Sequence, residues 1–345
     1  MTQQQPATSH DVARLAGVSQ PTVSRALRDD PRLSEKTRQR VRDAAQELHY
    51  VTSQRGRSLA TRSTGQIGIV VSDLGNSFYL EVLAELHDVL RRAGFRMLVL
   101  TPDGHDRVSL EQLADGSLDG VILTTTLRDS TLPQDLARRG LPFVLLNREV
   151  DDCPADICVV DNHEGAGLVA RELLELGHTA IAAIFGPDNT STGHARELGF
   201  RTVLSEAGID LPQDRWRRCP FDFTAGHEAA LDLLAVAKTA PTAIFCANDI
   251  IALGAYNALH GRGIRIPDDI SLIGFDDVLL ADWEVFQLTT VRQDIPRMVN
   301  IATELLLTRL NAEAGNAQEP RRVVLTPSLV RRGTHGPPPS GVVSR

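Results

Sequence analysis

The chain has 345 residues, of which 42% are hydrophobic, and a formal net charge of −8. This length is sufficient for two or three domains with large hydrophobic cores. The polar start MTQQQPATSH lacks the apolar segment of a signal peptide, and no apolar run reaches the roughly 18 residues that a membrane span needs. Composition therefore argues against export and membrane insertion and predicts a cytoplasmic protein.

The net charge is distributed unevenly along the chain. Residues 1–62 contain 11 Lys and Arg against 6 Asp and Glu, whereas the remainder contains 25 against 38. A basic head on an acidic body is typical of a protein whose head binds nucleic acid and whose body stays soluble through its charge.

Residues 11–28, DVARLAGVSQPTVSRALR, predict two short helices joined by a tight turn. Gly17 stands where the first helix ends, because glycine adopts a positive φ without steric cost. Ser19 is a good N-cap for the second helix, and Pro21 falls in its first turn, where a missing N–H costs nothing. The buried face of the second helix is expected to consist of Val23, Ala26 and Leu27. Ser34 starts a third helix that completes a small helical core.

The outer face of the second helix is polar and basic, as a helix in the major groove of DNA requires. We expect Gln20 and Arg25 to contact base edges, since an arginine can bond guanine O6 and N7. The residues expected to contact phosphates are Ser19, Thr22, Ser24 and Thr37, and Pro21 and Arg28 complete the predicted DNA-binding set. The alternative is an ordinary helical hairpin with a solvated face.

The motif DVARLAGVS-x-x-TVSR resembles the signature of LacI/GalR-type bacterial transcription regulators, and the resemblance extends over about residues 9–334. It implies a helix-turn-helix domain over 1–49, a hinge over 50–63 and an effector-binding and dimerisation domain over 64–333. Residues 334–345 are expected to form a disordered tail.

The resemblance also implies that the hinge folds on DNA, with Leu59 as an apolar wedge in the minor groove. This chain has Thr52 and Ser53 where the family has Pro and Asn, and Gly56 where it has Ala. A glycine within a helix costs about 1 kcal/mol relative to Ala, so the hinge is expected to be looser here. The alternative for this segment is a plain linker.

From Gln66 onward, short apolar runs alternate with helical patterns, and this series occurs twice. Such alternation predicts parallel sheets covered by helices on both faces. We therefore expect an α/β body of two parallel-sheet subdomains, similar to periplasmic binding proteins. Subdomain one is expected to contain about 64–161 and 292–320, and subdomain two about 162–291 and 321–333.

The carboxyl ends of parallel strands are where such sheets bind ligands, so the effector is expected between the two subdomains. The resemblance assigns this site to residues at strand ends and helix starts, namely Asp73, Asn76, Phe78, Arg148, Asp161, Arg196, Phe221, Asn248 and Asp276. Arginine, carboxylates and aromatic rings together suit a polyhydroxyl ligand. Each residue also has a structural alternative: a helix N-cap for an acidic residue or a core position for Phe78. Phe286 replaces a Pro of the family pattern near one of these loops.

No catalytic motif or metal-ligand spacing occurs, so the sequence predicts neither an enzyme nor a cofactor. The four cysteines form no C-x-x-C pair and indicate reduced thiols. The prediction is a DNA-binding transcription regulator, a repressor, that acts as a homodimer on operator DNA and responds to a sugar. The alternatives are a sugar-binding protein without a role on DNA, an enzyme acting on a sugar or nucleoside, and a regulator that takes a purine or nucleoside as corepressor.

Overall fold

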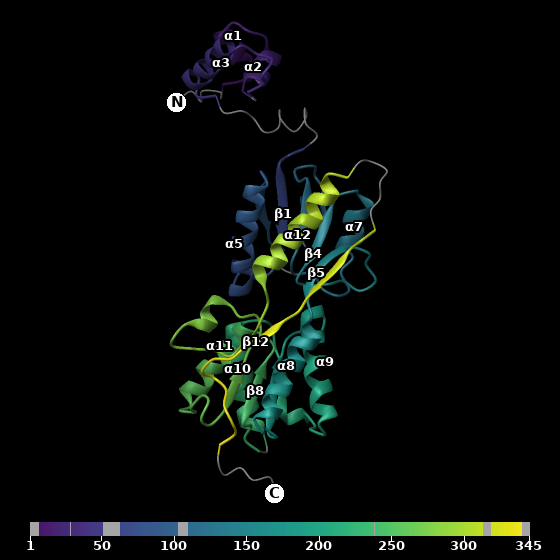
Figure 1. The fold of residues 1–345 in the computed structure, drawn as a ribbon, viewed down its shortest axis with the longest axis vertical. Coiled ribbons are helices and arrows are strands. Elements are labelled where there is room, and N and C mark those ends of the chain that lie inside the picture. Colours follow the sequence, from purple (N-terminus) through teal and green to yellow (C-terminus); the bar gives the residue numbers. More distant parts are fainter. Residues whose placement is uncertain are drawn as a thin grey trace. The chain divides into compact units, whose positions relative to one another are not determined.

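The computed structural model describes residues 7–27, 29–50, 63–102, 110–237, 239–312 and 319–339. The chain divides into two compact units, a head (Met1–Thr64) and a body (Gly65–Arg345) (Figure 1). Arg28, Gly56 and Leu59 lie outside the described residues, and so does nearly all of the expected hinge. None of the described helices has the length and apolarity to cross a membrane.

The described part of the head contains three helices, α1 (Ser9–Ala16), α2 (Gln20–Ala26) and α3 (Glu35–Glu47). Helix α1 begins two residues before the stretch read from the sequence, because Thr8 and Asp11 form a reciprocal capping box at its N-terminus. Gly17 ends α1 with φ 58°, and Ser19 caps α2 by accepting from the Thr22 N–H. The expected turn is therefore present between the two helices.

One small apolar cluster holds the three helices of the head together. Its buried members are Val12, Ala13, Ala16, Val23, Ala26, Val41, Ala44 and Ala45. These side chains are mostly alanine and valine, which bury little apolar area each, so the head gains only modest stability from its core.

The first lobe of the body (residues 65–161 and 293–326) is built on a six-stranded parallel sheet in the order β11-β5-β4-β3-β1-β2. Its strands are β1 (Gln66–Val70), β2 (Arg96–Leu100), β3 (Gly120–Leu123), β4 (Phe143–Leu146), β5 (Asp156–Val160) and β11 (Arg322–Leu325). Helices α5 (Ser77–Arg92) and α12 (Ile295–Leu310) lie side by side on one face (Figure 1). Helices α6 (Leu110–Leu113) and α7 (Leu132–Arg138) pack on the other face.

The second lobe (residues 162–292 and 327–339) contains a four-stranded parallel sheet in the order β7-β6-β8-β9. Its strands are β6 (Ile181–Phe185), β7 (Trp216–Arg218), β8 (Ala243–Cys246) and β9 (Ser271–Ile273). One face is covered by α8 (Asn162–Glu175) and α9 (Ser191–Glu206), the other by α10 (Phe223–Val236) and α11 (Asp249–Gly261) (Figure 1). Helices α8 and α9 approach so closely that a Cβ on Gly199 would lie 2.0 Å from the His163 carbonyl oxygen. Two short 3-10 helices, η1 (Gln213–Arg215) and η2 (Leu279–Asp282), complete this lobe.

The chain passes between the lobes three times, after β5, after β10 (Thr290–Arg292) and between β11 and β12 (Ser328–Val330). Strands β10 and β12 pair antiparallel at these crossings. The assignment of all of residues 321–333 to the second subdomain is wrong, because β11 pairs in parallel with β5 in the first sheet. This pairing protects the edge of β5, which would otherwise expose a row of unpaired backbone groups.

The start of the expected disordered tail is ordered instead. Thr334 is buried and exchanges two hydrogen bonds of 2.7 Å with Leu272, one from the Leu272 N–H and one from its own hydroxyl. Gly336 likewise donates to the Ser271 hydroxyl at 3.0 Å. Residues 334–336 therefore cover the edge of β9, and the prediction of disorder over 334–345 is wrong for this segment.

Candidate functional site

The exposed side of α2 carries the residues expected to contact DNA. Pro21 and Arg25 are exposed, and Thr22 and Ser24 are half-buried. Gln20 is half-buried as well, and its Nε2 donates to the Ser9 hydroxyl at 3.4 Å. The structure therefore presents a polar helix face on which the basic side chain of Arg25 is exposed to solvent.

Three hydroxyls of the expected phosphate-binding set, those of Ser19, Thr22 and Thr37, already take part in hydrogen bonds at the start of a helix. Ser19 Oγ lies 2.8 Å from Thr22 Oγ1 at the start of α2, and Ser34 Oγ lies 2.9 Å from Thr37 Oγ1 at the start of α3. A hydroxyl in such a pair still has a second lone pair, and the helix N-terminus beside it favours an anion. These positions are therefore compatible with contacts to phosphate.

Ion pairs occupy most of the basic side chains in the described part of the head. Arg14, Arg32, Arg38 and Arg42 each lie within 4 Å of a carboxylate. The described cations of the head that take part in no such ion pair are Arg25, Lys36 and Arg40. These three residues can approach the phosphate backbone without first breaking a direct ion pair.

In the body, Arg196 of α9 is the centre of a buried polar cluster. Its Nη2 lies 3.1 Å from Asp276 Oδ1, and its Nε donates to Asn162 Oδ1 at 2.8 Å. Its Nη1 donates to the Ala247 carbonyl at 2.7 Å, and the guanidinium lies over the Phe275 ring, 3.7 Å from the centroid. Segments that follow β5, β8 and β9 are thus gathered around one arginine at the carboxyl ends of their strands.

The Arg196–Asp276 pair is almost completely removed from solvent, with side-chain exposures of 3% and 5%. Burial raises the pKa of Asp276, while the neighbouring Arg196 opposes that rise. Burial also raises the pKa of Asp249 well above its usual range, and the charge of Asp276 raises it further. Removing either member of the ion pair would leave an uncompensated buried charge.

Arg148 forms a second centre, where the two lobes face each other. Its Nη1 donates to the Thr125 carbonyl at 3.2 Å within the first lobe. The guanidinium lies 6.0 Å from the ring centroid of Tyr79 in the same lobe and 5.7 Å from that of Phe221 in the second lobe. Asn147 donates to the Tyr79 hydroxyl at 3.3 Å, so that this hydroxyl is left to donate outward.

Several buried polar atoms in these two clusters have no hydrogen-bond partner among the described residues. They are Arg148 Nε, Asn147 Oδ1, Thr126 Oγ1 and Gln293 Oε1. A buried polar atom without a partner costs about 1–3 kcal/mol. Gln293 donates through its Nε2 to Asp276 at 2.7 Å and so belongs to the Arg196 cluster, whose Asp276 also interacts with the charge of Arg148. This set includes both donors and acceptors, the pattern that a hydroxyl group can satisfy.

The structure brings together four of the effector residues expected from the sequence: Arg148, Arg196, Phe221 and Asp276. Asp73 is half-buried beside them, where burial raises its pKa and Arg148 opposes that rise. Three other expected residues use a side-chain oxygen to cap a helix, namely Asn76 on α5, Asp161 on α8 and Asn248 on α11. Phe78 lies in the core with its ring 5.3 Å from that of Tyr79.

Four residues of the clusters were not in the expected set: Tyr79, Asn147, Asn162 and Gln293. Tyr79 and Asn162 directly follow two expected residues, Phe78 and Asp161. Gln293 stands in the segment LTTVRQDI between Arg292 and Asp294, and no local pattern distinguishes it there from its polar neighbours.

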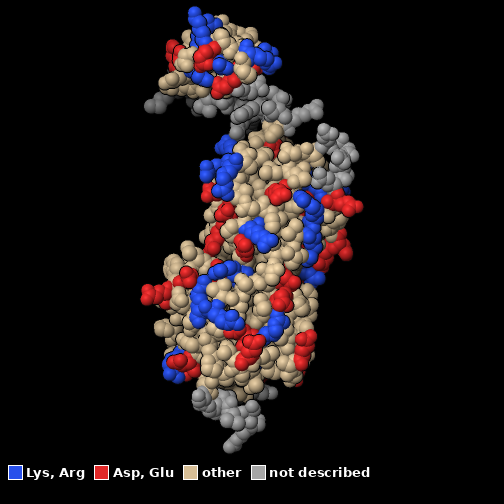
Figure 2. All heavy atoms as spheres, in the orientation of Figure 1, with Lys and Arg blue, Asp and Glu red and all other residues tan. Residues whose placement is uncertain are grey.

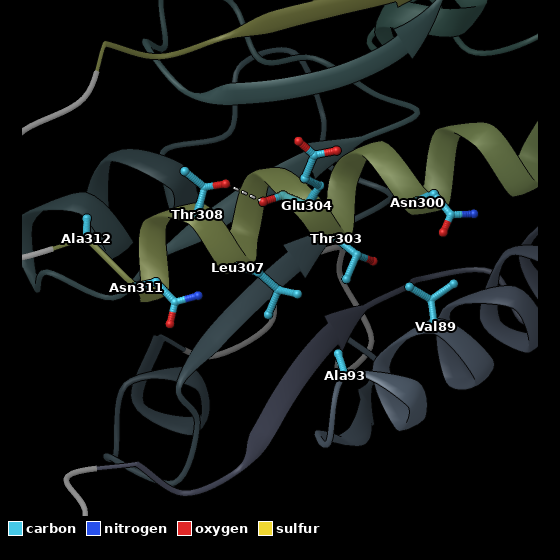
Figure 3. Close-up of a pocket in the computed structure, with 9 residues that line it drawn as sticks. All are labelled: Val89, Ala93, Asn300, Thr303, Glu304, Leu307, Thr308, Asn311 and Ala312. Atoms are coloured by element: carbon cyan, nitrogen blue, oxygen red, sulfur yellow. Dashed lines mark hydrogen bonds between the residues drawn. The ribbon is translucent and has the colours of Figure 1, made fainter.

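A separate groove of about 630 Å³ lies between α5 and α12 on the first lobe (Figure 3). Val89 and Ala93 line it from α5, and Thr303 and Leu307 from α12. None of the expected effector residues lines this groove. Phe286 contacts the ring of Tyr256 edge-on at 5.4 Å in the second lobe, and this packing fills the position where the family pattern has Pro.

The described residues contain no group of three or more side chains that could hold a metal ion. All four cysteines are free thiols, and burial raises the pKa of Cys158 and of Cys219 to about 12. A thiol with such a pKa is a poor nucleophile at neutral pH. On the face of the body drawn in Figure 2, basic and acidic side chains are interspersed. Several charged residues of the body form ion pairs, such as Arg322 with Glu149.

The head and the body together define a class of protein: a helix-turn-helix DNA-binding domain joined to a two-lobed α/β domain with a buried polar cluster between its sheets. Residues 8–53 match the family model described as "Bacterial regulatory proteins, lacI family", and residues 170–335 match the "Periplasmic binding protein-like domain". The HTH-type transcriptional regulator DegA of Bacillus subtilis (strain 168) is 34% identical over 96% of this chain and 98% of its own. The chain belongs to the lacI family of bacterial regulatory proteins.

Solved structures of similar proteins agree with this assignment. A lac repressor dimer bound to operator and the anti-inducer ONPF is 28% identical, with a TM-score of 0.80 over 96% of this chain and 99% of that one. A complex of the transcriptional regulator CelR with cellobiose is 30% identical, with a TM-score of 0.70 over 95% of this chain and 99% of that one. The resemblance and the fold class expected from the sequence are thus confirmed, and the protein is a DNA-binding transcriptional regulator. The alternative of a sugar-binding protein without a role on DNA is excluded.

Proposed function

We propose that this regulator represses transcription as a cytoplasmic homodimer and that a neutral sugar, bound between the lobes of the body, controls its affinity for operator DNA. The observation that carries the sugar proposal is the set of buried, unpartnered polar atoms around Arg148 and Gln293. A sugar hydroxyl can donate to Asn147 Oδ1 or Gln293 Oε1 and accept from Arg148 Nε or the Tyr79 hydroxyl. The cellobiose complex of CelR supports this ligand class.

The same atoms disfavour an anionic ligand. Asn147 Oδ1 and Gln293 Oε1 are acceptors, and the carboxylate of Asp276 lies beside Gln293. An ionised phosphate or carboxylate group carries only acceptor oxygens, so it could not donate a hydrogen bond to Asn147 Oδ1 or Gln293 Oε1. A purine is the second candidate, since the rings of Phe221 and Tyr79 on either side of Arg148 could stack on a planar base.

Thermal unfolding of the full-length protein against neutral sugars, sugar phosphates, nucleosides and purines tests these proposals. A ligand at a hundredfold its Kd stabilises the folded state by about 2.7 kcal/mol, which raises the midpoint measurably. A neutral-sugar response supports the proposal, whereas a response to purines alone replaces it with the corepressor alternative. Asp276→Asn should abolish the shift, while Asp161→Asn, which keeps an N-cap outside the clusters, should retain it.

The homodimer is proposed from an exposed apolar surface that both lobes share. Leu80 of α5 and three residues around η2, Leu279, Trp283 and Val285, expose large apolar side chains. The two lobes meet at this surface, because the Leu279 N–H donates to Glu81 Oε1 at 2.8 Å. A contiguous apolar surface of this kind marks a protein interaction site, and the lac repressor dimer supports assigning it to a second copy.

Sedimentation of two variants tests the dimer proposal. Trp283→Arg should shift the protein from dimer to monomer, because it places a charge in the proposed interface. Leu198→Arg makes the same change on an equally exposed leucine of α9, outside this surface, and should leave the dimer intact. A Trp283→Arg variant that remains dimeric at micromolar concentration would contradict the assignment.

On DNA, we propose that α2 enters the major groove with Gln20 and Arg25 on base edges, and that two heads read a near-palindromic site. Ser19, Thr22, Ser24, Thr37 and Arg28 are proposed to hold the backbone. Leu59 is proposed as the minor-groove wedge on the basis of the family resemblance. Leu59→Ala should then reduce the bend of operator DNA and leave sugar binding unchanged, and an unaltered bend angle would refute the wedge.

A further inference from the structure

Besides the Leu279–Glu81 and Gln293–Asp276 bonds described above, two further hydrogen bonds join the lobes where the carboxyl ends of their strands face each other. The Glu149 N–H of the first lobe donates to the Ser191 hydroxyl of the second lobe at 2.9 Å. The Arg128 N–H of the first lobe donates to the Asn189 carbonyl of the second lobe at 3.0 Å. Neither bond is made by the three segments that carry the chain from one lobe to the other.

Both contacts lie on rigid supports. In the first lobe, the Asp151 N–H donates to the Arg128 carbonyl at 2.8 Å, and the Asp151 and Arg128 side chains form an ion pair of 3.0 Å. In the second lobe, Thr190 caps α9 by accepting from the Gly193 N–H at 3.1 Å, and its hydroxyl donates to the Pro187 carbonyl at 2.7 Å. These local bonds hold each partner of the interlobe bonds in place within its own lobe, so we expect separation of the lobes to break both interlobe bonds together.

The contacts also sit directly beside the ligand-facing arginines. Glu149 follows Arg148 in the chain, and Ser191 is the first residue of α9, which carries Arg196 one and a half turns later. The Glu149–Ser191 bond thus fixes the distance between the two segments that present the arginines to a bound molecule.

We propose that Ser191 is a positioning residue: its bond to Glu149, together with the Arg128–Asn189 bond, forms a latch that holds Arg148 and Arg196 at the spacing for sugar binding. The functional meaning of the latch rests on the proposed sugar site. The latch itself is a property of the free protein, and it is testable without any ligand.

Amide hydrogen exchange of the full-length, ligand-free protein, resolved to single residues, tests the latch. In Ser191→Ala, exchange at Arg128 should accelerate about 2- to 12-fold, the factor that the loss of one hydrogen bond implies. The Arg128 N–H bonds to Asn189 and not to Ser191. Its exchange rate therefore rises only if loss of the Glu149–Ser191 bond makes the lobes separate more often. Ser191→Thr keeps a hydroxyl and should restore the original rate.

Ser130→Ala is the matched control. It removes a hydroxyl that accepts only a local hydrogen bond, from the Leu132 N–H within the first lobe, so Arg128 exchange should remain as in the parent protein. Faster exchange confined to Glu149 in Ser191→Ala, with Arg128 unchanged, would overturn the latch.

A second measurement separates the latch from the proposed sugar site. With a neutral sugar that stabilises the parent protein, Ser191→Ala should bind about 2- to 12-fold more weakly, and Ser191→Thr should bind normally. Unchanged affinity in Ser191→Ala would overturn the positioning role even if Arg128 exchange accelerates. Absence of any sugar response would remove the proposed function while the exchange data still decide whether the latch exists.

Discussion

In the head, the residues expected to meet DNA lie within residues 19–28, apart from Thr37 and Leu59, and those that the structure describes are exposed or half-buried. In the body, the polar clusters draw on segments from Tyr79 to Gln293, and nearly every member is buried. A DNA-reading side chain can therefore be changed with little effect on the fold. A ligand-facing side chain in the body also holds distant segments together, so function and stability are coupled there.

The largest expected effect is that of Arg196→Ala on stability. Loss of the guanidinium leaves Asp276 buried without its partner, which should reduce the free energy of unfolding of the body by about 3–5 kcal/mol. Urea denaturation measures this change. Arg171→Ala on α8 removes an arginine whose ion pair with Glu164 is exposed, with side-chain exposures of 41% and 47%, and should cost at most about 1 kcal/mol. Equal losses of stability for the two variants would contradict the coupling of function and stability that is inferred for the body.

Arg25→Ala should act on DNA binding alone. We expect operator affinity to fall by about 1–3 kcal/mol and specificity to relax at one base of each half-site, with the unfolding curve unchanged. Arg40→Ala, which changes another head cation outside any ion pair, should weaken binding to all sequences and reduce its salt dependence. Binding-site selection that returns the parent base preference for Arg25→Ala would rule out its role in base recognition.

Ser19→Ala should lower the stability of the head by about 1 kcal/mol, because it removes the N-cap of α2. Ser19→Asn retains a good cap and should restore the stability. Because Ser19→Asn keeps the cap and lacks the hydroxyl, a loss of operator affinity in this variant measures the contact of the Ser19 hydroxyl with phosphate. Unfolding of the head that is identical in Ser19→Ala and the parent protein would show that the cap contributes nothing.

The smallest effect is a pH dependence in the body. A hydrogen bond from Arg331, with a further one from His335, holds the pKa of Glu172 below its usual range. This carboxylate therefore contributes stability above the ordinary glutamate pKa of about 4.3, and the contribution is lost as the pH falls through the lower folded-state value. Glu172→Gln should flatten the acid side of the stability profile, whereas Glu175→Gln, at an exposed position of the same helix, should not. Parallel profiles for parent and Glu172→Gln would contradict this account.

The same contrast explains which features could be predicted from the sequence. The turn at Gly17, the cap at Ser19 and the apolar face of α2 depend on residues within a few positions of one another, so local rules suffice. Strands and helices of the body also follow from local apolar patterns. The parallel partner of β11 and the ordered segment 334–336 depend on unpaired sheet edges that exist only after the lobes have formed.

The members of the proposed effector site could be named from the sequence only where a family motif marks them. Arg196 and Asp276 were identified from such motifs, and the structure pairs them. Asn76, Asp161 and Asn248 have the same polar chemistry at strand ends, but a carboxylate or amide that precedes a helix is equally suited to capping it. Sequence position alone does not separate these roles, because both occur at the carboxyl ends of strands.

The three passages of the chain between the lobes determine how this protein can be recombined. Each lobe consists of two separate stretches of sequence, so no continuous gene segment encodes either one, and a cut at any one crossing leaves the lobes covalently joined by the other two. The head, in contrast, is one continuous block at the start of the chain. Exchange between genes can therefore give the body a new DNA specificity in a single step, whereas the two halves of its proposed ligand site must be inherited together.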